Sequence, residues 1–176
     1  MKRKYWIIAL SILVLLIIVS VATVIILNYS NSSTSSTQDG TKIGPLTLYY
    51  IAVDDNGKSG TKIGCGDSVV AVKTKTVTTD NSVKSTFDSL LSDHDALYGK
   101  DNLYNVLHYS ILSYVSSTTS GDTVTVKLSG DLNLAGVCDS PRVQSVLELS
   151  AKTAAGVSKA DIFINDKPLS ELLSLK

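Results

Sequence analysis

Two cysteines are the first residues in this sequence that could do chemistry. Cys65 lies in Gly-Cys-Gly-Asp, a pattern typical of a tight turn, and Cys138 lies in Gly-Val-Cys-Asp-Ser-Pro-Arg at residues 136–142. The pair could form a disulfide bond, remain as two buried thiols, bond to another chain or act as a redox pair. The Cys-x-x-Cys spacing of many redox pairs is absent. The choice among these therefore depends on the compartment, because thiols stay reduced in the cytosol.

The compartment is indicated by the start of the chain. Residues 5–27 form an apolar run without a charged residue, and about 20 apolar residues span the core of a bilayer. A Lys-Arg-Lys triplet at residues 2–4 precedes the run, and no basic residue follows it before Lys42. The positive-inside rule then places residues 1–4 in the cytoplasm. We therefore predict a single-pass protein of the bacterial cytoplasmic membrane whose C-terminal domain is extracytoplasmic.

An alternative interpretation of this run is a cleaved signal peptide. Residues 20–22 fit the small-residue pattern for cleavage after Ala22, but the apolar run continues past that position to Leu27, which favours an uncleaved anchor. After the run, residues 28–43 are rich in Ser, Thr and Asn and are predicted to form a flexible linker. Residues 44–176 then form one domain. Since this domain is placed outside the cell, the even cysteine count predicts a disulfide between Cys65 and Cys138.

Other candidates for chemistry are weak. Asp93, His94 and Asp95 could be metal ligands, but adjacent side chains on an extended chain point apart and no second cluster completes the ligand set. Neither His94 nor His108 lies beside a nucleophile motif such as Gly-x-Ser-x-Gly. The Gly-Lys-Ser at residues 57–59 lacks the glycine that begins a phosphate-binding loop. We expect no catalytic residue, no metal site and no cofactor.

Charge bears on the kind of partner. The chain has 16 basic and 16 acidic residues among 176, but the triplet at residues 2–4 is basic and every acidic residue lies beyond position 38. The predicted domain is therefore mildly acidic. A nucleic-acid partner would need a clustered basic face, so we expect none.

The predicted elements are short β-rich runs separated by turns, with two amphipathic helices. Alternating or β-branched runs predict strands, and apolar residues at helical spacing predict helices. The order is strands at residues 46–53 and 69–77, a helix at 82–91, strands at 111–116 and 123–128, a helix at 141–155, a strand at 160–164 and a short helix at 168–175. This β-β-α-β-β-α-β order predicts an α+β fold, a mostly antiparallel sheet with two helices on one face.

Local signals fix several element ends. Asp80 or Asn81 is expected to cap the first helix, and Asp139 or Ser140 to cap the second near Pro141. The second helix is expected to end at Gly156. Residues 92–108 are harder to assign to a secondary structure. We interpret the apolar side chains at 103–107 as one helical turn that packs on the core.

Several pieces of the domain together resemble the GerMN domain. They are Leu-Tyr-Tyr-Ile at residues 48–51, Phe-Asp-Ser-Leu-Leu at 87–91, the run at 121–130, Gln144, and Ile-Phe-Ile-Asn at 162–165. GerMN domains occur in bacterial sporulation and spore-germination proteins and in envelope lipoproteins, and the two cysteines resemble a cysteine-bearing branch. The resemblance implies a non-enzymatic, envelope-facing domain akin to ring-building motifs, which assemble protein complexes.

The sequence is compatible with two functions, and an enzyme is a third alternative. The domain could be an interaction module that contacts other envelope proteins or further copies of itself, which would require an apolar patch or a free strand edge. It could instead be a sensor that binds a glycan or small molecule, which would require a concave pocket lined by aromatic residues such as Tyr98 and Tyr104.

Overall fold

The computed structural model describes residues 41–174, which belong to one compact unit. The predicted membrane anchor at residues 5–27 and most of the predicted linker lie outside the described residues. The described part is an α+β fold, as the sequence predicts, but its strands form two sheets rather than one. The longer elements are β1 (Lys42–Ala52), β3 (Ser68–Thr79), α2 (Ser82–Leu91), β6 (Ile111–Ser120), β7 (Thr123–Asp131), α3 (Asp139–Ala155), β8 (Lys159–Ile164) and α4 (Leu169–Ser174).

The first sheet is built on the antiparallel pair β1 and β3. The short strands β2 (Thr61–Lys62), β4 (Leu97–Tyr98) and β5 (Leu103–Tyr104) complete the order β2-β3-β1-β5-β4. Along β1, Leu46, Leu48 and Tyr50 alternate with more exposed residues and are buried. This period of two gives the sheet one face for the core.

The second sheet has the order β6-β7-β8-β9, where β9 (Lys167–Pro168) is a short edge strand. β6 and β7, which contain the strands predicted at residues 111–116 and 123–128, form an antiparallel hairpin. Both strands are longer than predicted, so the turn between them is short and consists of Gly121 and Asp122. β7 and β8 are parallel, and α3 is the crossover between them. Val124, Val126 and Leu128 of β7 point into the core and are at most 2% exposed.

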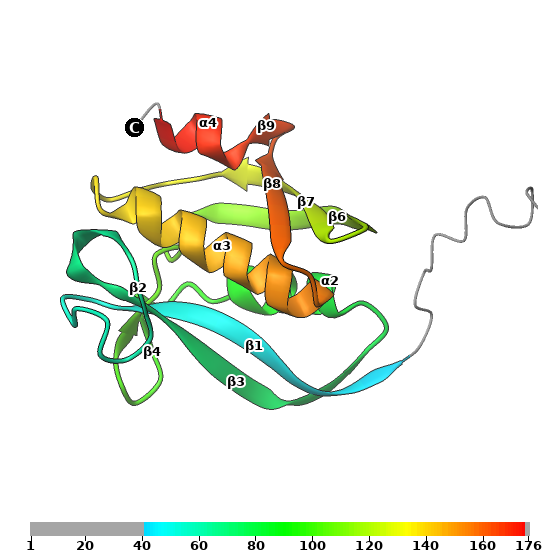
Figure 1. The fold of residues 1–176 in the computed structure, drawn as a ribbon, viewed down its shortest axis with the longest axis horizontal. Coiled ribbons are helices and arrows are strands. Elements are labelled where there is room, and N and C mark those ends of the chain that lie inside the picture. Colours follow the sequence, from blue (N-terminus) through cyan, green and yellow to red (C-terminus); the bar gives the residue numbers. More distant parts are fainter. Residues whose placement is uncertain (1–40, 175–176) are drawn as a thin grey trace, which may run out of the picture. The chain divides into compact units, whose positions relative to one another are not determined.

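The two main helices lie between the sheets (Figure 1). α2 packs on β1 and β6, while α3 packs on β1, β7 and β8, so each helix contacts both sheets. We expected the helices on one face of a single sheet, and that expectation is wrong. Periodicity in the sequence shows which face of a helix is buried. It does not show which strands pair with each other, and here the strands early in the chain and those late in the chain form separate sheets.

Both helices lie where the sequence predicts them, with two differences at the start of α3. α2 has the predicted limits, and Asn81 caps it by accepting a hydrogen bond from the Lys84 amide at 2.9 Å. α3 begins at Asp139, before Pro141, and no side chain caps it; Asp139 is used in another interaction described below. The helix ends as predicted at Gly156, whose φ of 72° is a left-handed conformation that favours glycine.

The segment between α2 and β6 has no helical turn, contrary to our expectation for residues 103–107. Leu103 belongs to β5 and is buried, as is Leu107. The buried Asn105 organises this segment, because its side-chain amide donates to the Asp93 carbonyl at 2.8 Å and its side-chain oxygen accepts from the Leu107 amide at 3.0 Å. A polar side chain that replaces backbone hydrogen bonds in this way leaves no periodic signal in the sequence.

Candidate functional site

The predicted disulfide is present between Cys65 and Cys138, whose Cα atoms lie 5.9 Å apart. Cys65 lies in η1 (Gly64–Gly66), the turn that enters β3, and Cys138 immediately precedes α3. The turn packs closely on the helix, since a Cβ atom on Gly64 would lie 3.1 Å from the ring of Pro141. The bond therefore ties the turn before β3 to the N-terminal end of α3, 73 positions later in the sequence.

Beside the disulfide, Arg142 bridges two buried carboxylates. Its Nε donates to Oδ2 of Asp67 at 2.7 Å, and its Nη1 donates to Oδ1 of Asp139 at 3.1 Å. The Asp67 side chain is 0% exposed and that of Asp139 is 4% exposed. The other oxygen of each carboxylate accepts a backbone amide, from Asp54 and from Ala135 respectively. Every carboxylate oxygen in this group is therefore satisfied.

The loop between β1 and β2 is fixed by a third carboxylate, Asp55. Asp55 accepts hydrogen bonds from the Ser68 hydroxyl and from the backbone amides of Gly57 and Ser59. The Ser68 hydroxyl, with smaller contributions from Ser59 and Gly57, lowers the pKa of Asp55 to about 2. The loop is thus held against β3 by a carboxylate that stays charged at neutral pH.

We call this region the disulfide corner and define it by Asp55, Cys65, Asp67, Cys138, Asp139 and Arg142. Tyr104 lies against it, because the Arg142 guanidinium is 5.5 Å from the centre of the Tyr104 ring. A cation over an aromatic face is an attractive contact. The sequence predicts the disulfide but not the bridging arginine. The spacing of Asp139 and Arg142, three residues apart at a helix start, was the only available signal for that bridge.

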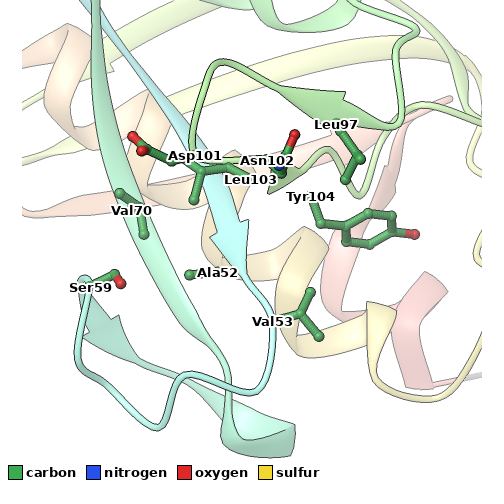
Figure 2. A pocket seen from close by; sticks show the side chains of 9 residues that line it. All are labelled: Ala52, Val53, Ser59, Val70, Leu97, Asp101, Asn102, Leu103 and Tyr104. Atoms are coloured by element: carbon green, nitrogen blue, oxygen red, sulfur yellow. The ribbon is translucent and has the colours of Figure 1, made fainter.

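A hollow of about 570 Å³ opens beside the disulfide corner, between the loop after β1 and the β4–β5 hairpin (Figure 2). Its lining is mostly apolar, with three polar side chains. The lining residues are Ala52, Val53, Ser59, Val70, Leu97, Asp101, Asn102, Leu103 and Tyr104. Tyr104 therefore lines the hollow as a ligand-binding function would require, but Tyr98 does not.

Tyr98 instead stacks on Tyr50, with ring centres 4.1 Å apart. The Tyr50 hydroxyl donates to Oδ2 of Asp93 at 3.0 Å, and burial together with the neighbouring Asp93 raises the pKa of Tyr50 well above its usual value. Asp93 is thus turned toward Tyr50, while His94 is exposed. Within residues 41–174, no group of three His, Cys, Asp or Glu side chains is arranged to hold a metal ion.

The edge strand β6 is a third surface feature, separate from the disulfide corner and the hollow. Among the described residues, β7 is the only strand that pairs with β6, so its other edge is open. Ile111 and Val115 on this strand are 70% and 56% exposed, and Tyr109 just before it is 64% exposed. No residue of β6 carries a charge. An open, uncharged strand edge with exposed apolar side chains is a surface that native proteins usually protect.

Comparisons with known proteins give no relative. No family model matches the chain, and neither a curated protein nor a solved structure is similar enough to count as a match. In the part of the chain that the structure describes, no helix is both long enough and apolar enough to cross a membrane.

Proposed function

We propose that this chain is a membrane-anchored, extracytoplasmic and non-enzymatic module that binds other proteins in the bacterial cell envelope. Residues 5–27 would hold it in the membrane, with the domain outside. The disulfide supports this placement, because such bonds persist in oxidising compartments. The sequence resemblance to GerMN domains supports an assembly role of the sporulation and germination kind.

The observation that carries the proposal is the open edge of β6. A strand edge binds another strand by main-chain hydrogen bonds, and neighbouring side chains set the specificity. Native sheets protect such edges with lysine, proline or a short length. β6 is 10 residues long and contains neither lysine nor proline. A bulge between Tyr114 and Ser116 is the one protective feature it has, and it leaves the later half of the strand regular.

The polar groups of the disulfide corner support a non-enzymatic role. A catalytic acid or base needs an oxygen that is free to meet substrate. The oxygens of Asp67 and Asp139 are already bonded to Arg142 and to backbone amides. Nδ1 of His108 lies 2.7 Å from the Asn105 carbonyl within its own turn. These side chains are engaged in holding loops together.

Photo-crosslinking in membranes tests the binding surface. A photoreactive amino acid at Ser116, which is exposed on β6, should give a crosslinked product in cells that produce the full chain. The matched control is the same amino acid at Thr76, an exposed residue on β3 of the other sheet. Equal products at both positions, or none at Ser116, would contradict the proposal.

Membrane placement has its own test. A reporter that is active only outside the cytoplasm should work when fused after Lys176, and the fusion should need detergent for extraction from membranes. Reporter activity in the culture medium would show cleavage after Ala22 and contradict the anchor.

A second candidate function, ligand binding, is favoured by the hollow. Its volume of about 570 Å³ lies within the usual range for small-molecule sites, and Val53 and Leu97, two of the exposed large apolar side chains, both line it. Leu97→Lys would place a cation there. It should abolish binding of a neutral apolar dye if the hollow is a site, and leave the Ser116 crosslink unchanged.

A further inference from the structure

We infer that the partner of β6 is β6 of a second copy of this chain, paired antiparallel about a two-fold axis at Thr118. This inference rests on the proposed function and names the partner. It concerns residues 116–120, the regular part of the strand between the bulge at Val115 and the turn at Gly121.

Symmetric pairing places each residue opposite another residue of the same strand, so charge decides whether a strand can pair with itself. Like charges directly opposite each other destabilise a sheet. β3 also has an open edge beyond its pairing with β2, but Lys73 and Lys75 lie on that stretch. The other three end strands of the two sheets, β2, β4 and β9, are each only two residues long. β6 is the one long end strand of the described residues without a charge.

The side chains of residues 116–120 also match one another. Their sequence is Ser-Ser-Thr-Thr-Ser, so every residue carries a hydroxyl. An axis at Thr118 pairs Ser116 with Ser120 and Ser117 with Thr119 of the second copy, and Thr118 with itself. Paired Ser and Thr side chains across two strands attract through hydrogen bonds. The two charged residues next to this segment are both engaged. Asp122 accepts hydrogen bonds from the amide and hydroxyl of Ser158, and Lys127, opposite Ser116 on β7, donates to Asp166 at 2.8 Å.

The surface of residues 116–120 is accessible in one copy. Ser116, Thr118, Thr119 and Ser120 are exposed and Ser117 is half-buried. A pair of five-residue segments buries much less than the roughly 1,200 Å² of a stable interface. We therefore expect the dimer to be weak in dilute solution. The membrane anchor of the proposed function would hold copies in one plane and raise their effective concentration.

Cysteine scanning of the full chain in membrane vesicles tests the pairing. Both native cysteines are in the disulfide, so an introduced cysteine is the only free thiol. Thr118→Cys should give a covalent dimer on mild oxidation, because directly opposed residues have Cα atoms about 4.5–5.5 Å apart. Ser116→Cys should give little, because two copies of residue 116 would be roughly 13 Å apart along the strands. Ser116→Cys combined with Ser120→Cys should again give a dimer.

A control position on the other sheet distinguishes self-pairing of β6 from the more general proposed function. Thr76→Cys, an exposed threonine on the edge of β3, should give little dimer. Equal dimer yields at positions 116, 118 and 76 would overturn the inference. A crosslink from position 118 to a different protein, recognised by mass, would overturn self-pairing and support the interaction module. No dimer at any β6 position would overturn self-pairing, and the photo-crosslink at Ser116 would then decide on the interaction module by itself.

Discussion

The disulfide corner and the β6 edge are stabilised by opposite means. At the corner, one covalent bond and a bridged pair of carboxylates join loops that are far apart in sequence, and the charged atoms are shielded from water. At the β6 edge, uncharged hydroxyl side chains lie open to solvent on a strand with one neighbour. We infer that stability is concentrated in the corner, which leaves β6 free to change partners at little cost to the fold.

The largest effect is expected at the disulfide. Replacing Cys65 and Cys138 together by serine opens a loop of 73 positions, and the chain-entropy model gives a loss of about 4 kcal/mol. Urea unfolding of residues 41–176 would measure it. A reducing agent should lower the stability of the parent domain by a similar amount and leave the variant unchanged. A loss below about 1 kcal/mol would show that the corner does not depend on the bond.

Arg142→Ala should have the next largest effect, about 3 kcal/mol, because it leaves Asp67 and Asp139 buried without their cation. This value is the lower end of the usual range for breaking a buried ion pair, because the Arg142 side chain is 14% exposed and water can reach its place. The matched control is Lys127→Ala, which breaks an exposed ion pair with Asp166 and should cost under about 1 kcal/mol. Equal losses for the two variants would contradict the central role of Arg142.

Asp55 makes part of the stability of the corner pH-dependent. Its pKa of about 2 in the folded domain lies below the ~3.9 of an unfolded chain. Its contribution should therefore be complete above about pH 4 and disappear as the pH falls toward 2. Asp55→Asn should lower the unfolding free energy at pH 6, and this difference should shrink by pH 2. Asp54→Asn, at the exposed neighbouring position, is the control, and parallel pH curves for Asp55→Asn and the parent would contradict the role of Asp55.

The sequence predicts much of this molecule, and the failures share a cause. Both helices and the strands of the β6–β7 hairpin follow from local periodicity, which acts within short segments. The disulfide spans 73 positions, but the chain has only two cysteines, so a single intramolecular pairing was available. The division into two sheets does not follow from local patterns, because it depends on which strands pair across long separations. The bridge from Arg142 to Asp67 is missed for the same reason, since the residues lie 75 positions apart.

The candidate sites show the same limit. A ligand-binding function was expected to need a pocket lined by aromatic residues such as Tyr98 and Tyr104. The structure separates them, because Tyr98 stacks on Tyr50 while Tyr104 faces Arg142 and the hollow. A free strand edge was expected as one sign of an interaction module, but the sequence does not reveal which strand ends a sheet. The lack of charge in β6 gains meaning only once its position is known.

The smallest effect on stability is expected at the β6 edge, from Thr118→Lys. Thr118 is exposed and faces away from the helices, opposite Thr125 on β7, so the substitution should change the unfolding free energy by less than about 0.5 kcal/mol. In the proposed dimer, however, it places two lysines opposite each other on the symmetry axis, where like charges repel. In membranes, therefore, the paired crosslink from Ser116→Cys with Ser120→Cys should be lost when Thr118→Lys is added, and it should remain when Thr76→Lys is added instead. If Thr118→Lys destabilises the fold as much as Arg142→Ala does, β6 belongs to the stable part of the molecule and the contrast between the two regions is wrong.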